Sequence, residues 1–160
     1  MKFSFLVLGA LALLLVPAFA EEEGPDVRGV WVADVSPDKV LLVTDCACED
    51  ASNSIEFTCK PKSGEVHVEL HDFLDKGPKE GDDAKVNFVI DGKAIEQDTK
   101  FANFDGEEKM PVFDLPVDDP LIASLAQGKS LKLVFGKKTA ATKMKGSRAA
   151  FTRLQNYCGK

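Results

Sequence analysis

Residues 55–71 read IEFTCKPKSGEVHVELH, and this stretch decides the fold. Apolar side chains occupy every second position on either side of a Ser63-Gly64 turn signal: Ile55, Phe57 and Cys59 before it, Val66, Val68 and Leu70 after it. A period of two is the pattern of strands that bury one face and expose the other. The stretch therefore predicts two half-buried β-strands joined by a turn.

Similar runs continue in both directions from this stretch. Strand-like segments occupy residues 30–35, 40–44, 86–90 and 131–135, and the apolar residues between Ile95 and Phe113 indicate two further short strands. Asp91-Gly92 is a strong hairpin turn pair. Trp31, the single tryptophan of the chain, is expected to be a core anchor of the first strand.

The period changes near the C-terminus. Asp119-Pro120 reads as an N-cap followed by a first-turn proline, and Gly128 suits the end of a short helix. A basic loop is expected over residues 137–146, followed by a second helix that Ser147 caps and Cys158 fastens. The pattern predicts a mainly β domain: an antiparallel β-sandwich or partly closed barrel of about eight strands with two short helices.

The first 20 residues predict export. A lysine at position 2, an apolar run to Leu15 and the end Ala18-Phe19-Ala20 have the order of a secretory signal peptide. We expect a mature chain that starts with a flexible acidic segment, residues 21–28, and continues as one domain, residues 29–160. The apolar run is too short to span a bilayer, so the expected location is periplasmic or secreted, without a membrane-spanning segment.

Four cysteines remain after the predicted signal peptide: Cys46, Cys48, Cys59 and Cys158. An even number in an oxidising compartment indicates two disulfides. A bond between Cys46 and Cys48 closes a strained ring, so we expect Cys59 to pair with one of them and Cys158 with the other. The spacing of Cys46 and Cys48 is too tight for a structural zinc site.

Charge is divided unevenly along the chain. Residues 21–119 hold 26 acidic and 10 basic side chains, whereas residues 120–160 hold nine basic and no acidic ones. The basic third either neutralises acidic loops of the same molecule or forms a docking surface for an anionic partner. The candidate docking residues are Lys137, Lys138, Lys143, Lys145 and Arg148. Net acidity and predicted export argue against nucleic acid as the partner.

Sites for chemistry are scarce in the sequence. His67, Glu69 and His71 would share one strand face, where a divalent metal could bridge them, but a solvated face without metal is the interpretation we favour. There is no nucleophile elbow, and Gly128-Lys129-Ser130 lacks the first glycine of a phosphate-binding loop, since position 123 is alanine. No catalytic residue and no cofactor is expected.

The order of these features resembles a known group of exported proteins. The features are Trp31 in the first strand, the strand ending at Cys59, residues 86–92 running into Asp-Gly, the short helix and strand of residues 121–133, and a terminal helix ending in Cys158. The chain is similar in this respect to bacterial proteins of the invasion-associated locus B type and to periplasmic accessory proteins of type VI secretion. The resemblance implies a non-enzymatic, disulfide-bonded β-sandwich of the cell envelope.

Three functions follow as hypotheses. The first is a non-catalytic envelope protein that binds a macromolecule, as an invasion or secretion accessory module. The second is an inhibitor of a secreted hydrolase such as a lysozyme or protease, which would use an exposed loop at residues 76–83 or 105–109. The third is a periplasmic protein that binds a small molecule or metal at the face of His67, Glu69 and His71.

Overall fold

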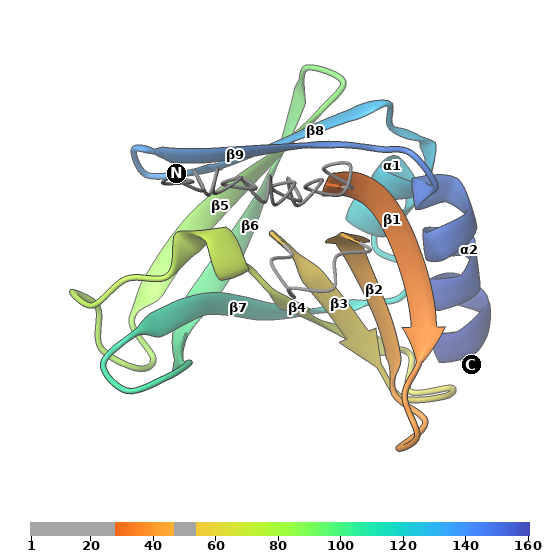
Figure 1. Cartoon of the computed structure of the whole chain (residues 1–160), viewed down its shortest axis with the longest axis horizontal. Helices are drawn as coiled ribbons and strands as arrows, with labels where there is room; N and C mark the ends of the chain where they lie inside the picture. Colours follow the sequence, from red (N-terminus) through yellow and green to blue (C-terminus); the bar gives the residue numbers. More distant parts are fainter. Residues whose placement is uncertain (1–27, 47–53) are drawn as a thin grey trace, which may run out of the picture.

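The computed structural model describes residues 28–46 and 54–160 (Figure 1). The predicted signal peptide, the predicted lead-in up to residue 27, and Cys48 lie outside the described residues. The elements in chain order are β1 (Arg28–Val35), β2 (Leu41–Cys46), β3 (Glu56–Cys59), β4 (Glu65–Glu69), the 3₁₀ helix η1 (His71–Phe73), β5 (Asp83–Ile90), β6 (Lys93–Asn103), β7 (Lys109–Pro116), α1 (Pro120–Gln127), β8 (Ser130–Phe135), β9 (Lys138–Lys143) and α2 (Ser147–Cys158). Neither helix in this part of the chain is long and apolar enough to cross a membrane.

All described strands belong to one antiparallel sheet in the order β1-β2-β3-β4-β7-β6-β5-β8-β9. The sheet curls until its two ends meet: Val30 forms a bridge with Lys145, and the Trp31 N–H donates to the Lys145 carbonyl at 2.8 Å. Figure 1 shows β1 and β9 converging beside the helices. The predicted mainly β fold with two helices near the C-terminus is confirmed, and its two halves are parts of one continuous sheet.

The additional strand is β9. Residues 138–143 were expected to be part of a basic loop, yet they pair residue by residue with β8, from Ser130 opposite Lys143 to Phe135 opposite Lys138. The side chains of this strand are exposed or half-buried, so it lacks the apolar alternation that marks the other strands. The extended conformation of β9 therefore depends on its backbone pairing with β8, whose residues alternate between buried and exposed positions.

The core is centred on three aromatic rings from distant parts of the chain. The ring of Trp31 lies 6.1 Å from that of Phe57 and 5.0 Å from that of Phe151, and Phe57 meets Phe151 edge-on at 5.1 Å. Trp31 is 3% exposed, as expected of a core anchor. Because Phe151 lies in α2, this cluster fastens the last helix to β1 and β3.

Both helices begin close to where the sequence placed them. Asp119 caps α1, its carboxylate accepting from the Leu121 N–H at 2.8 Å, and Pro120 occupies the first turn. The cap of α2 differs from the expectation, because Gly146, with φ +84°, precedes the helix and Ser147 is its buried first residue. A β-carbon at Gly146 would lie 2.7 Å from the Trp31 carbonyl oxygen, so the close approach of α2 to β1 requires glycine.

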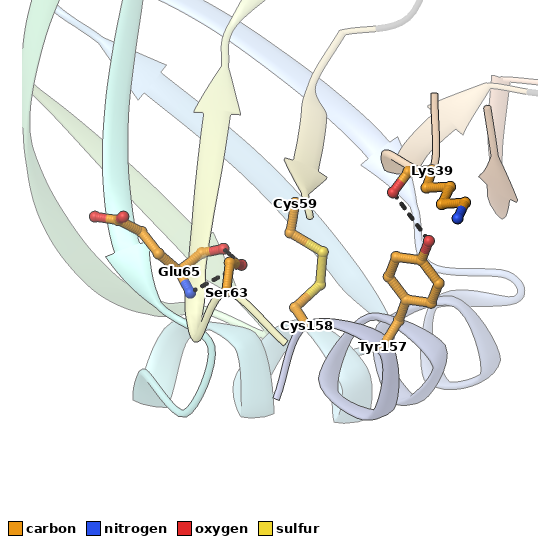
Figure 2. Close-up of a disulfide and its surroundings, with 6 residues drawn as sticks. All are labelled: Lys39, Cys59, Ser63, Glu65, Tyr157 and Cys158. Carbon is orange, nitrogen blue, oxygen red and sulfur yellow. Dashed lines mark hydrogen bonds between the residues drawn. A yellow bond between two sulfur atoms is a disulfide. The ribbon is translucent and has the colours of Figure 1, made fainter. Parts of the chain in front are cut away.

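The disulfide of the described residues joins Cys59, at the end of β3, to Cys158, the last residue of α2, with Cα atoms 5.9 Å apart (Figure 2). The expectation that Cys158 pairs with Cys46 or Cys48 was wrong. The β3–β4 turn caps the end of α2: the N–H of Gly64 donates to the Cys158 carbonyl at 2.7 Å, and the N–H of Lys62 to that of Tyr157. This contact of the turn with α2 brings Cys158 next to Cys59. Cys46 also takes part in a disulfide.

The Tyr157 hydroxyl adds a third connection at the end of α2, donating to the Lys39 carbonyl at 2.9 Å in the turn between β1 and β2 (Figure 2). Side chain, backbone and disulfide therefore hold the C-terminus of α2 against two turns of the sheet.

We predict that Cys158→Ser lowers the free energy of unfolding by ~4–5 kcal/mol, because the disulfide closes a loop with a sequence separation of 99 residues and so restricts the unfolded chain. Urea unfolding followed by fluorescence of the single Trp31 measures the change. Cys59→Ser should have the same effect, and the double variant should add little to either single one. An unchanged unfolding midpoint would contradict the role assigned to this bond.

We also predict that Gly146→Ala destabilises the protein more than Gly136→Ala. Both glycines have positive φ, but a β-carbon at Gly136 has nothing within 4 Å, whereas at Gly146 it meets the Trp31 backbone. Gly136→Ala should therefore cost only the left-handed strain, ~1–2 kcal/mol, and Gly146→Ala a further ~1–3 kcal/mol from overpacking. Equal losses in thermal and urea unfolding would show that α2 can move away from β1 without cost.

Candidate functional site

The outer face of β3, β4 and β7 carries a cluster of carboxylates and histidines. Along β4 the side chains of Val66 and Val68 are buried, which leaves His67 and Glu69 on the outer face. The neighbouring strands add Glu56 from β3 and Asp114 from β7, and η1 adds His71. We call these five residues, Glu56, His67, Glu69, His71 and Asp114, the carboxylate–histidine cluster.

The strand register explains why these residues meet. Glu56 lies directly opposite Glu69, and His67 lies between Thr58 on one side and Asp114 on the other. Like charges opposite each other on neighbouring antiparallel strands are destabilising. The Glu56–Glu69 pair therefore needs a nearby positive charge, and His71 is placed to supply it.

His71 reaches the two glutamates from outside the strand. The sequence predicted that His67, Glu69 and His71 share one strand face, but β4 ends at Glu69 and His71 lies in the 3₁₀ helix η1. The turn at η1 nevertheless places the His71 ring beside Glu69. Its Nε2 lies 3.4 Å from Glu69 Oε2 and 3.8 Å from Glu56 Oε2. The backbone N–H of His71 donates to the Ser54 carbonyl, and its ring meets that of Phe104 edge-on at 5.8 Å.

His67 extends the network on the other side of Glu69. Its Nδ1 lies 2.7 Å from Asp114 Oδ1, and its Nε2 lies 3.6 Å from Glu69 Oε1. The structure thus brings together the three residues that the sequence singled out. The sequence did not identify Glu56 and Asp114. Both stand at polar positions of alternating strands, but only the strand order places them beside His67 and His71.

Attraction between the carboxylates and the histidines raises the pKa values of His67 and His71 and lowers the pKa of Glu69. The pKa of His67 rises to about 9, mainly through Glu69 and against partial burial, with Asp114 adding to the rise. Asp114, the closer of the two carboxylates at 2.7 Å, contributes through both a hydrogen bond and its charge. The pKa of Glu69 falls to about 2, through His67 first and then His71, and Glu69 in turn raises the pKa of His71.

The structure divides the predicted docking residues between two places. Lys137 and Lys138 lie at the turn from β8 to β9, and Lys138 Nζ is 3.8 Å from Asp75 Oδ2 and 2.9 Å from the Leu74 carbonyl. Lys143 is at the other end of β9, about 16 Å away for a strand that rises 3.3 Å per residue. The extended strand therefore separates residues that a loop would have allowed to cluster.

A second group of cations lies where β9 leads into α2. Lys143, Lys145 and Arg148 are exposed there. Lys129, which follows α1, lines a shallow groove together with Arg148. The groove encloses about 580 Å³, and its floor includes Met144 and Ala126. We call Lys129, Lys143, Lys145 and Arg148 the basic surface. Lys129 was not among the docking residues expected from the sequence, since it precedes the expected basic loop.

The start of α2 adds positive potential to this groove. Its first turn contains no acidic residue, and the cap residue, Gly146, offers no side-chain acceptor. The unsatisfied N–H groups at a helix N-terminus carry a partial positive charge. The helix end and the side chains of Lys129 and Arg148 therefore favour the same kind of ligand, an anion.

The two loops proposed for hydrolase inhibition lie side by side. Asp75 and Lys109 exchange backbone hydrogen bonds at 3.0 and 2.8 Å, which joins the start of loop 76–83 to the end of loop 105–109. Asn103 also hydrogen-bonds Glu80 across them. Figure 1 shows these loops at the end of the molecule away from α2.

The sequence matches no protein-family model and no curated protein. Among solved structures, the fold is similar to that of invasion associated protein B from Bartonella henselae, with a TM-score of 0.50. The two chains are 16% identical, and the match covers 79% of this chain and 92% of that one. At this identity the likeness shows a shared fold, which supports the structural part of the resemblance noted in the sequence.

We predict that the His67 ring titrates near pH 9 in the metal-free protein, where an unperturbed histidine titrates near 6.5. A pKa raised by folding contributes stability that is complete below pH 6.5 and is lost as the pH rises through about 9. NMR titration of the His67 Hε1 resonance gives the pKa directly. In urea unfolding, the stability difference between wild type and His67→Gln should shrink over this interval. A ring that titrates at its ordinary value would refute the proposed pairing.

Proposed function

We propose that this protein is an exported, non-catalytic component of the cell envelope that binds a macromolecular partner with a negatively charged surface. The basic surface is the binding region, and one observation carries the proposal. Within residues 28–46 and 54–160, no carboxylate oxygen lies within ion-pair distance of the side-chain nitrogens of Lys129, Lys143, Lys145 or Arg148. In these ranges, the one acidic group bonded to this set is Asp91, which accepts from the backbone N–H of Lys129 at 3.0 Å and whose pKa is lowered mainly by that bond.

The alternative, internal neutralisation, has limited support in the described part of the chain. There, Lys138 is the one cation after Asp119 with a carboxylate ion pair, to Asp75. The cations of the basic surface repel one another and the helix end, and nearby anionic groups on a partner would relieve that repulsion. Such a surface steers encounter with the partner more than it adds affinity.

The apolar floor of the groove suits a protein partner. Interfaces bury an apolar centre inside a polar rim, and here Met144 and Ala126 line the same groove as Lys129 and Arg148. Arginine also makes planar two-point contacts with carboxylates. We therefore favour an acidic protein as the partner.

Export and an accessory role rest on separate support. Residues 1–20 have the pattern of a signal peptide, and a disulfide at a sequence separation of 99 suits an oxidising, periplasmic or extracellular compartment. One solved structure with a similar fold is that of an invasion associated protein, and by analogy this supports a role at the envelope or host interface.

The second candidate function is inhibition of a secreted hydrolase. It is favoured by the adjacent loops 76–83 and 105–109, which backbone hydrogen bonds hold together and which carry Glu80, Asp82 and Glu107. Activity assays of a basic lysozyme with increasing amounts of the protein test this function. Full lysozyme activity in the presence of saturating protein would exclude lysozyme as the inhibited enzyme.

We predict that the triple variant Lys143→Ala, Lys145→Ala, Arg148→Ala associates more slowly with the partner, because these charges steer the encounter. The variant should keep its fold, because exposed charges contribute little to stability. Affinity capture from an envelope extract identifies the partner, and association rates with the purified partner measure the effect. Wild-type association should slow as the Debye length falls from about 10 Å at 0.1 M salt to about 3 Å at 1 M.

The matched control replaces three exposed lysines elsewhere, as Lys76→Ala, Lys79→Ala and Lys93→Ala, with the same change in net charge. It should bind the partner like the wild type. If both triple variants lose binding equally, net charge and not the basic surface determines association. A destabilised basic-surface variant with unchanged binding would favour internal neutralisation.

A further inference from the structure

We propose that Glu56, Glu69 and His71 form a binding site for one divalent transition-metal ion of the zinc type. The site lies on the outer face of β3 and β4 and is separate from the basic surface, so the inference does not depend on the proposed partner. The sequence favoured a solvated face without metal for His67, Glu69 and His71, and the strand register adds Glu56 directly opposite Glu69.

The three donor atoms have the spacing of a metal ligand set. Glu56, Glu69 and His71 each offer one atom, and these atoms lie within 4.8 Å of one another. His71 Nε2 and Glu69 Oε2 are 3.4 Å apart. Two ligands at the usual zinc distance of roughly 2.1 Å in a tetrahedron are separated by about 3.4 Å. A small inward movement of Glu56, whose Oε2 is 3.8 Å from His71 Nε2, completes the set.

The chemistry of the donors selects the ion. Imidazole nitrogen binds zinc, copper and nickel well, whereas calcium and magnesium prefer sets made of oxygen alone. Three protein ligands leave at least one position for water. The site therefore favours zinc over calcium, although it contains two carboxylates.

His71 Nε2 is a polar atom without a satisfied hydrogen bond. It is buried, and no atom of the described residues meets hydrogen-bond geometry with it. Buried polar atoms in native proteins nearly always have a partner. The nearest oxygens of Glu69 and Glu56 lie 3.4 and 3.8 Å from this nitrogen, and an ion bound among the three groups would give His71 Nε2 a partner.

Neighbouring groups hold the ligands in place. His67 Nε2 lies 3.6 Å from Oε1 of Glu69, the oxygen that does not face His71, and Asp114 in turn fixes His67 at 2.7 Å. The Phe104 ring packs edge-on against the His71 ring. Such outer contacts orient metal ligands, and their loss commonly lowers metal affinity about 10- to 100-fold.

Charge favours an ion at this position as well. Glu56 and Glu69 are like charges on opposed positions of β3 and β4, and Asp72 adds negative potential next to them. The positive groups that face them are His67 and His71 themselves. Metal binding must displace a proton from His71, so the affinity should increase as the pH rises.

Calorimetric titration of zinc chloride into tag-free protein, first stripped with a chelator and dialysed, tests the proposal. One ion per chain should bind. His71→Ala and Glu56→Gln should each weaken binding at least about tenfold, and His67→Gln about tenfold through the loss of orientation. The matched control for Glu56→Gln is Glu65→Gln, which makes the same charge change on β4, about 13 Å from Glu69, and should bind zinc like the wild type.

Several results would overturn the proposal. These are no zinc binding by the wild type, equal binding by His71→Ala, or displacement of zinc by equimolar calcium. Thermal melts establish that each variant folds, and Glu56→Gln, which keeps the side-chain shape, tests the site even if His71→Ala does not fold. The triple variant of the basic surface should keep full zinc affinity, which separates a failure of this inference from a failure of the proposed function.

Discussion

The packing of α2 against β1 and β3 of the curled sheet is the constraint on which the rest of the structure depends. Phe151 fits between Trp31 and Phe57, with ring centroids 5.0 and 5.1 Å away, and so joins the last helix to two strands near the start of the domain. Gly146 allows the close approach of the helix to β1, and the Cys59–Cys158 bond holds its other end. Hydrophobic burial and a covalent bond thus act on the two ends of one helix.

The docked helix also determines where the charged groups lie. Because α2 follows β9 after a short connection, that connection, the end of α1 and the first turns of α2 line one groove. Lys129 and Arg148 line the groove, and pairing with Ser130 places Lys143 next to Lys129. On the strands away from this groove, antiparallel register places Glu56 opposite Glu69 and His67 beside Asp114. Both proposed binding regions therefore lie on the outer faces of strands and at helix ends, since the interior is filled by side chains.

Local patterns predicted most of the elements correctly. Alternation marked β3 and β4, and Asp119-Pro120 and Gly128 marked α1, because each of these signals acts within a few residues. The strand β9 was missed, since an exposed edge strand without apolar alternation has no local signature. The cysteine pairing was wrong for a related reason: the strain of neighbouring cysteines is a local argument, whereas the position of Cys158 depends on where α2 docks.

The sequence by itself determined the fold class, the helix starts, the core position of Trp31 and the presence of His67, Glu69 and His71 on one region of the chain. These features depend on periodicity and on short-range backbone preferences, which are determined by residues close together in the sequence. Only the tertiary structure decided that Glu56 and Asp114 join the histidines, that Lys129 joins Lys143 and Arg148 while Lys138 pairs with Asp75, and that Cys59 bonds Cys158. Strand order and helix docking bring together residues that are distant in sequence, and these depend on how the whole core packs.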